Sequence, residues 1–115
     1  MNQETFREYC LSLPAVEEGL PFGPTTLVFK VYNKMFALMP LDEDDFSCNL
    51  KCDPERALEL RAEYDFIIPG FHMNKVHWNT IKTNHNQHND LIIQLIDHSY
   101  QLVLKSIPLN KRILI

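Results

Sequence analysis

The first hydrophobic pattern along the chain is helical. Within residues 3–13, apolar and aromatic residues recur at positions i, i+3, i+4 and i+7, a spacing that places them on one side of an α-helix. This stripe is formed by Phe6, Tyr9, Cys10 and Leu13. Asn2 is a suitable N-cap and Pro14 cannot continue a helix, so the pattern predicts a helix between these two residues.

From residue 25 to residue 52 the pattern changes to β-branched and aromatic runs with partial alternation. The runs TTLVFKVY (25–32) and MFALMP (35–40) are joined by the polar pair Asn33-Lys34, which predicts a β-hairpin. The run FSCNLKC (46–52) predicts a third strand after an acidic turn. The preceding connector AVEEGLPFGP (15–24) contains two glycines and two prolines and is expected to be irregular.

Two more helices and a second hairpin are predicted in the rest of the chain. Asp53-Pro54-Glu55 combines an N-cap, a proline in the first turn and an acidic residue, which predicts a helix continuing through ALELRAEY (57–64). In PGFHMNKVHWNTI (69–81), Asn74-Lys75 is expected to turn a hairpin. Residues 90–107 predict the clearest helix. Its polar stripe of Gln94, Asp97, His98, Gln101 and Lys105 lies opposite Ile92, Leu95, Ile96 and Val103.

The predicted order is one helix, three strands, a helix, two strands and a final helix. Because the strands come in consecutive groups, the order predicts an antiparallel sheet covered on one face by helices, a two-layer α+β fold. The 115 residues suffice for one hydrophobic core, so residues 1–115 are expected to form a single domain.

Composition narrows the class of protein. The chain is 45% hydrophobic and 23% charged, as in ordinary globular proteins. Its apolar stretches are only a few residues long, whereas a membrane span needs about 20. Three cysteines without a framework spacing are typical of reduced, packed thiols. We therefore expect a cytoplasmic protein without a membrane segment.

The charges are unevenly distributed, although the net charge is −4. Residues 1–65 contain six Lys/Arg and thirteen Asp/Glu, whereas residues 66–115 contain five Lys/Arg, two Asp and all five histidines. Such asymmetry can leave a basic face on an acidic protein. It loses this meaning if the two parts intermingle in the fold.

The sequence contains none of the usual motifs for metal binding or nucleophilic catalysis. The pairs His85/His88 and His72/His77 lack the CxxC or HExxH context of zinc sites, so solvated loop histidines are the simpler interpretation. The acidic run at 42–45 lacks the glycine and distal glutamate of an EF-hand. No GxSxG frames a serine, and Cys10 lies on an apolar stripe. We expect no metal, no cofactor and no enzymatic activity.

The predicted hairpin tips carry the remaining candidate chemistry. Lysines at a hairpin tip can meet phosphates, asparagine and histidine can donate hydrogen bonds to phosphates or base edges, and an exposed tryptophan can stack on a base. The candidate residues are Lys30 and Lys34 at the first tip, with His72, Asn74, Lys75, His77 and Trp78 at the second. Taken alone, these residues fit a buried tryptophan and solvated turn lysines better.

Six segments in the same order give the chain a family resemblance. They are FREYCLSLP, the Pro21-Phe22-Gly23 turn, LVFKVYNKMFAL, DPERALELR, PGFHMNKVHW and SYQLVLKSIP. With them the chain resembles the MmcQ/YjbR family of small bacterial proteins over nearly its whole length. The resemblance implies a CyaY/frataxin-like fold, a helix-flanked antiparallel sheet, and DNA binding through two β-hairpin wings.

Carried onto this chain, the wings are the hairpin around Lys30 to Phe36 and the one around His72 to Trp78. The resemblance implies that Lys34 and Lys75 neutralise phosphates, that the neighbouring asparagine and histidines add hydrogen bonds, and that Trp78 braces the second wing. Val76 stands where the family often has a second basic residue. DNA binding is therefore expected to be weak and salt-dependent.

The alternative is a protein- or small-molecule-binding module without affinity for nucleic acid, whose partner the sequence does not identify. Its support is the net acidity together with an aromatic group able to line a groove. This group is formed by Phe22, Phe29, Tyr32 and Phe36. A positive strip linking both tips favours DNA, and an apolar cleft favours the alternative.

Overall fold

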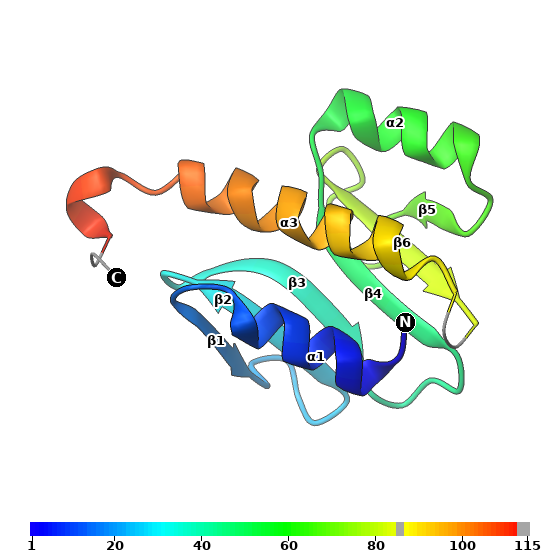
Figure 1. Ribbon diagram of the computed structural model, residues 1–115, viewed down its shortest axis with the longest axis horizontal. Helices are drawn as coiled ribbons and strands as arrows, with labels where there is room; N and C mark the ends of the chain where they lie inside the picture. Colours follow the sequence, from blue (N-terminus) through cyan, green and yellow to red (C-terminus); the bar gives the residue numbers. More distant parts are fainter. Residues whose placement is uncertain (85–86, 113–115) are drawn as a thin grey trace.

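The computed structural model describes residues 1–84 and 87–112, and it has three α-helices on one side of a six-stranded sheet (Figure 1). The elements in chain order are α1 (Gln3–Ser12), β1 (Val16–Gly19), β2 (Thr26–Val31), β3 (Lys34–Pro40), β4 (Phe46–Lys51), α2 (Pro54–Glu63), β5 (Ile67–Pro69), β6 (Trp78–Thr83), α3 (Asn89–Lys105) and the 3-10 helix η1 (Leu109–Lys111).

The sheet has the strand order β1-β2-β3-β4-β6-β5, and every neighbouring pair is antiparallel. Strand β4 pairs with β6 rather than β5, because α2 carries the chain outward and the last two strands return as a hairpin with β5 at the edge. The predicted two-layer α+β architecture is confirmed.

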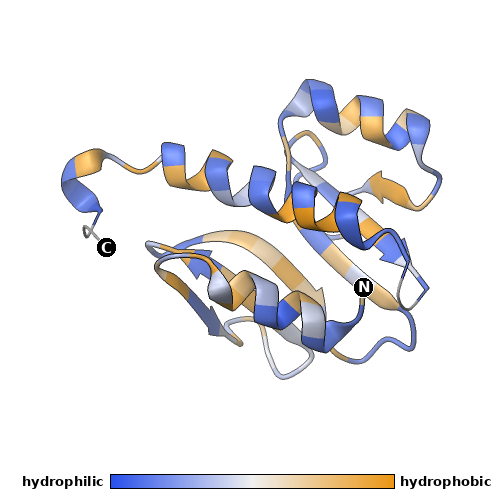
Figure 2. Cartoon of the chain, in the orientation of Figure 1, coloured by the Kyte–Doolittle hydropathy of each residue, from blue (hydrophilic) through white to orange (hydrophobic). Residues whose placement is uncertain are grey.

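The core lies between the sheet and the helices. Its centre is aromatic: the ring of Phe6 on α1 contacts Phe29 and Phe46 of the sheet at centroid distances of 5.9 and 5.3 Å. The predicted apolar stripe of α3 is buried, and Figure 2 shows it as orange bands alternating with blue along the helix. Burying these stripes, rather than intrinsic helix propensity, is what holds both helices against the sheet.

The predicted helix starts are confirmed. The Asn2 side chain accepts a hydrogen bond from the Thr5 amide at 2.8 Å, and Asp53 accepts one from the Arg56 amide at 3.1 Å. In each case the side chain satisfies an amide that the first helical turn leaves without a partner.

Polar contacts fix α3 against its neighbours. The Tyr9 hydroxyl of α1 donates to Asp97 of α3 at 2.6 Å, and this hydrogen bond, together with burial, raises the pKa of Tyr9 to about 12. The fully buried Ser99 hydroxyl donates to the Phe36 carbonyl oxygen at 2.5 Å and accepts from the Lys51 amide at 2.9 Å. Ser99 thus satisfies backbone groups of both β3 and β4.

Two sequence predictions about the first half of the sheet are wrong. The connector predicted to be irregular contains β1, whose residues pair with β2 from Val16–Val31 to Gly19–Val28. The first hairpin turns at Tyr32 and Asn33, which have φ of 47° and 68°, and not at Asn33-Lys34. Two consecutive residues in the left-handed region match the right-handed twist of the strands, and Lys34 therefore opens β3.

The second hairpin also differs from its prediction. No strand forms at FHM, because β5 ends at Pro69 and residues 70–77 make a long connection to β6. We call this segment the 70–77 loop. Its backbone groups bond within the loop and to β6, so it is built as a compact turn structure and not as a two-residue hairpin.

The three cysteines are free and buried, as expected. Burial raises the pKa of Cys10 and Cys48, so these thiols stay protonated at neutral pH. Among the described helices, none combines the length and the apolar character required to cross a membrane.

The double role of Ser99 predicts a large effect of removing its hydroxyl. Ser99→Ala leaves the Lys51 amide and the Phe36 carbonyl without their buried partner, so the free energy of unfolding should fall by about 1–3 kcal/mol. Urea denaturation followed by circular dichroism measures the change. Ser106→Ala is the control, since Ser106 is exposed and its hydroxyl donates to Val103 within its own helix end. Equal losses in the two variants would contradict the role of Ser99.

Candidate nucleic-acid surface

The face of the sheet that points away from the helices, called the outer face here, carries a row of residues running across the strands at one end. Lys30 of β2 pairs with Met35 of β3, and Lys51 of β4 pairs with Trp78 of β6. Their neighbours along the strands, such as Phe29 and Leu50, are buried under the helices. Because side chains alternate between faces, these four residues share the outer face. We call them the lysine row.

A small apolar cluster on the outer face connects the two predicted wings. Trp78 packs with Val28 and Leu38, and Met35 and Met73 pack against them. Met35 lies beside the tip of the β2–β3 hairpin and Met73 lies in the 70–77 loop. The structure therefore brings both predicted wings to the same end of the sheet.

Trp78 is the base of this arrangement and not a surface for stacking. Only 8% of its surface is exposed. Gly70 passes directly over it, and a Cβ atom at Gly70 would lie 2.8 Å from the Trp78 Cβ and 2.9 Å from the Trp78 carbonyl oxygen. This agrees with a bracing role for Trp78 and removes the alternative in which its ring stacks on a base.

Asn74 shapes the 70–77 loop. Its side-chain oxygen accepts hydrogen bonds from the amides of Val76 and His77, at 2.9 and 3.2 Å. Its carbonyl oxygen accepts one from the Trp78 amide at 3.0 Å. These are the bonds of an Asx-type turn, so the Asn74 oxygen is engaged within the loop and only its amide nitrogen is left to contact a ligand.

Arg61 of α2 holds the loop from the other side. Its Nε donates to the Asn79 side-chain oxygen at 2.6 Å, and its Nη2 donates to the carbonyl oxygens of Trp78, at 3.2 Å, and Lys75. The Lys75 ammonium donates to the Gly70 carbonyl oxygen at 3.0 Å and closes the loop on itself. The Lys75 side chain is still exposed, and its ammonium has two further donors.

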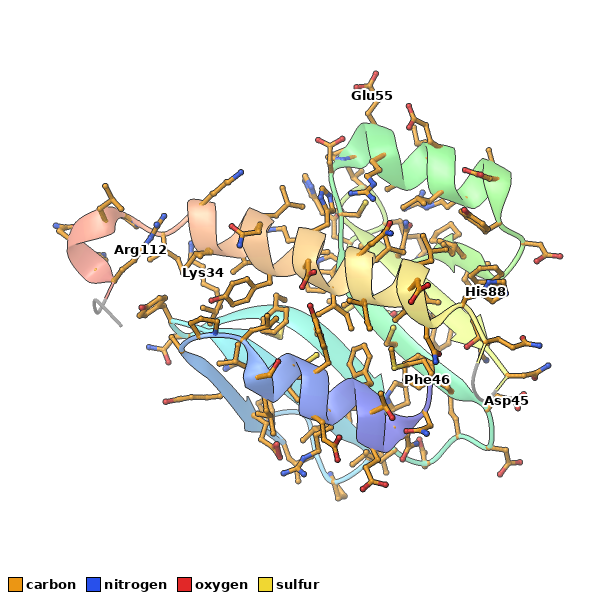
Figure 3. The ribbon with its side chains drawn as sticks, in the orientation of Figure 1. Lys34, Asp45, Phe46, Glu55, His88 and Arg112 are labelled. Atoms are coloured by element: carbon orange, nitrogen blue, oxygen red, sulfur yellow. The ribbon has the colours of Figure 1, made fainter. Side chains whose placement is uncertain are left out.

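The other predicted site residues are divided between two sides. His72 and His77 are exposed on the loop, and His72 has a left-handed backbone with φ of 60°. Lys34 stands opposite Val31, whose side chain lies in the core, so Lys34 leaves the hairpin tip on the helix side. Figure 3 shows it at that tip. Lys30 and Lys34 therefore do not form one contact surface.

Both ends of the outer face carry charged side chains. Lys30 and Lys51 lie at the end near the 70–77 loop, while the acidic turn at residues 42–45 joins β3 to β4 at the opposite end. Glu17 of β1 is the acidic residue opposite Lys30. The end near the 70–77 loop therefore carries two lysines and Glu17, and the opposite end carries Lys82 beside the acidic turn.

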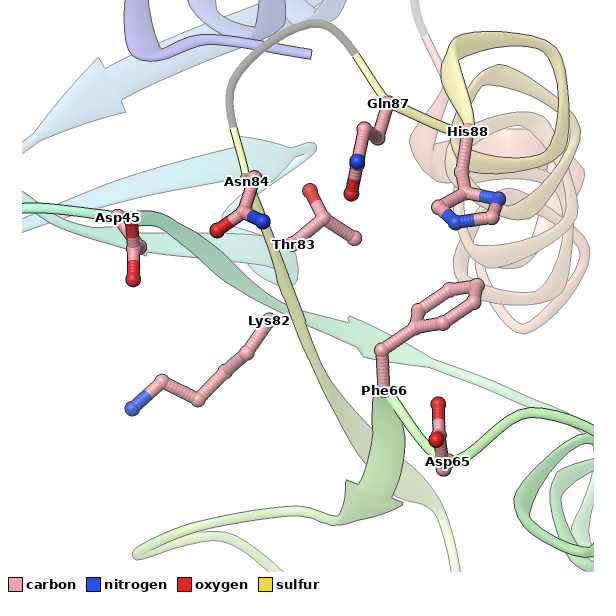
Figure 4. A pocket seen from close by; sticks show the side chains of 8 residues that line it. All are labelled: Asp45, Asp65, Phe66, Lys82, Thr83, Asn84, Gln87 and His88. Carbon is pink, nitrogen blue, oxygen red and sulfur yellow. The ribbon is translucent and has the colours of Figure 1, made fainter.

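A polar pocket of about 290 Å³ lies at the far end of β6 (Figure 4). Its lining residues are Asp45, Asp65, Phe66, Lys82, Thr83, Asn84, Gln87 and His88. The His88 ring stacks on Phe66 at 4.1 Å, and the buried Thr83 hydroxyl has no hydrogen-bond partner among residues 1–84 and 87–112. Figure 4 shows the labelled Asn84 and Gln87 on either side of Thr83.

Metal binding gains no geometric support. Within residues 1–84 and 87–112, no three His, Cys, Asp or Glu side chains gather closely enough to hold an ion. His88 stands at the N-terminus of α3 without a capping bond from its side chain, whereas His85 lies outside the described residues.

Sequence reasoning missed two residues of the surface. Arg61 falls in the stripe Ala57, Leu60, Arg61 and Tyr64, and an arginine inside a core-facing stripe is a signal for a buried polar contact. Lys51 belongs to the polar alternation Ser47, Asn49 and Lys51 of the predicted strand, which marks the face away from the core.

The comparisons with known proteins agree in fold and sequence. The YjbR family model matches residues 11–102. The uncharacterized protein YbdF of Escherichia coli O157:H7 is 39% identical over 101 residues, covering 88% of this chain and 83% of that protein. The uncharacterized protein YjbR of Escherichia coli K12 is 31% identical over 105 residues, covering 91% of this chain and 89% of that protein.

Two solved structures are similar to this chain in fold and in sequence. The crystal structure of a Deinococcus radiodurans protein with a DUF419 domain matches at a TM-score of 0.88 and 37% identity, covering 95% of this chain and 83% of that one. A crystal structure of a Pseudomonas syringae protein matches at a TM-score of 0.76 and 29% sequence identity. The match covers 90% of this chain and 99% of that one.

The close approach at Gly70 predicts that no side chain is tolerated there. Gly70→Ala should lower the free energy of unfolding by about 1–3 kcal/mol and shift the fluorescence of Trp78, because the added Cβ meets backbone and Cβ atoms. Gly19→Ala is the matched control, since the nearest atom to its Cβ is 4.0 Å away. If both variants unfold at the same urea concentration, Gly70 does not constrain the loop.

Proposed function

The chain belongs to the YjbR family, and from this premise we propose that it is a non-enzymatic protein that binds DNA weakly through the lysine row and the 70–77 loop. The observation that carries the proposal is their position together at one end of the outer face. This surface differs from two independent wings, because Lys34 lies on the helix side and Lys51 takes its place.

The spacing of the cations suits a phosphate backbone. Lys30 and Lys51 are two strands apart, which is about 10 Å, and β6 with Lys75 beyond it follows at the next strand position. Long lysine side chains bridge such gaps easily, so one DNA backbone passing across the strands meets all three ammonium groups. His72 and His77 on the same loop add hydrogen-bond donors.

The small number of contacts makes the proposed binding weak. Each neutralised phosphate contributes about 0.9 to the slope of log affinity against log salt, so three lysines give a slope near −3. The backbone contacts carry no sequence information, and the proposed binding is therefore non-specific. A cytoplasmic location, where bacterial DNA is found, is part of the same proposal.

Lys51→Ala tests the surface without disturbing the loop, because its side chain makes none of the bonds that hold residues 70–77. Titration of labelled duplex DNA at about 50 and 200 mM salt should show weaker binding and a slope smaller by roughly one. Lys105→Ala, an exposed lysine at the end of α3, is the control and should bind as the wild type does. Absence of wild-type binding at low salt, or equal losses in both variants, would refute the proposal.

The polar pocket favours a second candidate function, binding of a small neutral ligand. The buried Thr83 hydroxyl has no hydrogen-bond partner in the part of the chain that the structure describes, and such a hydroxyl is costly unless a ligand or water completes it. Asn84 and Gln87 offer both donors and acceptors, while two aspartates against one lysine disfavour an anion. A pocket of about 290 Å³ suits a monosaccharide or a nucleoside.

Thr83→Val tests the pocket, since it replaces the hydroxyl by a methyl group of similar volume. Without ligand the variant should unfold at the same or a higher temperature, because an unpaired buried hydroxyl is removed. With millimolar adenosine, ribose or glucose, the melting temperature should rise for the wild type only. A wild type unaffected by all three probes would argue against this function.

A further inference from the structure

The 70–77 loop exposes a phenylalanine beside its cations. Phe71 is 65% exposed, in contrast to the buried Trp78, and its ring lies 4.0 Å from the His72 ring at an angle of 50°. Val76, across the same loop, is 58% exposed. Other apolar side chains are equally exposed, and what distinguishes Phe71 is its position, because the Lys75 ammonium donates to the carbonyl oxygen of Gly70, the residue before Phe71.

The exposed ring is held by a rigid backbone. The Phe71 amide donates to the Thr80 hydroxyl at 2.9 Å, and the Thr80 hydroxyl in turn donates to Asn49 of β4. The Gly70 amide donates to the Trp78 carbonyl oxygen at 2.9 Å. The backbone amides of Gly70 and Phe71 are therefore both hydrogen-bonded to β6. A ligand meets a pre-ordered surface and does not have to order it, which favours binding.

An aromatic face beside lysines is suited to unpaired nucleobases. Bases in a duplex are stacked on each other and hide their faces, whereas those of a single strand are free to stack on a side chain. Stacking tolerates any base, which fits a surface without base-specific contacts. Histidine takes part in the same way, because its ring is also planar.

We propose that the Phe71–His72 pair stacks on unpaired bases, while Lys51 and Lys75 hold the backbone, so that single-stranded DNA is the preferred ligand. This inference rests on the proposed DNA binding and adds the class of strand to it. The competing occupant of the exposed Phe71 and Val76 is a protein surface, and the experiment separates the two.

The test compares Phe71→Ala with the wild type on labelled oligo-dT of about 15 nucleotides and on the matching dT·dA duplex. The wild type should bind the single strand more tightly than the duplex at the same salt. Phe71→Ala should weaken single-strand binding by about 5- to 150-fold, equivalent to about 1–3 kcal/mol, and leave duplex binding unchanged. Phe71→Trp should restore or improve single-strand binding.

Leu109→Ala is the control, because Leu109 is 78% exposed on η1, which lies well away from the 70–77 loop (Figure 1). It should bind both probes as the wild type does. If duplex and single strand bind equally and Phe71→Ala affects neither, the inference is overturned and the proposed DNA binding stands. If the wild type binds neither probe, both fail, and the exposed ring is left to a protein partner.

Discussion

The guanidinium of Arg61 joins helix α2 to residues 75–79, where the 70–77 loop continues into β6. It reaches from α2 to the Asn79 side chain in β6 and to the carbonyl oxygens of Trp78 and Lys75. The guanidinium is planar and presents its donors in a fixed fork, whereas a lysine ammonium offers three donors from a single nitrogen at the end of a flexible stem. The position of Lys75, the exposure of Phe71 and the cover over Trp78 all depend on the loop that this arginine holds. The helix thus supports the candidate surface without touching a ligand.

The sequence predicted the parts of the fold that have a strong local pattern. The stripes of α1 and α3 and the caps at Asn2 and Asp53 were sufficient to place these helices within one or two residues. Strand β1 has no such pattern, because VEEG lacks alternation and forms only by pairing with β2. The pairing of β4 with β6 was equally beyond local reasoning, since it depends on where α2 crosses the sheet. The frataxin-like classification stays a prediction.

The sequence indicated which segments carry the candidate site, but not how their side chains are placed in the fold. The notable stretch around Lys75 and Trp78 does form one compact unit, but Trp78 supports it and Phe71 is the exposed ring. A tryptophan next to polar residues gives no sign of its burial, because this is decided by Val28 and Leu38 on other strands. The same holds for Lys34, whose side follows from a register shift between Phe29 and Lys30 that the alternation pattern cannot show.

The net charge of −4 does not by itself oppose a DNA-binding role. Strand β4 separates the acidic turn from Lys51, and its six residues span about 17 Å. At physiological ionic strength charges are screened over about 8 Å, so a phosphate at the lysine row interacts mainly with the nearby lysines. The repulsion from residues 42–45 and from the acidic positions of the helix layer is then a weak background. For the proposed ligand at this end of the sheet, Lys51 and Lys75, together with Lys30 beside Glu17, therefore count for more than the total charge.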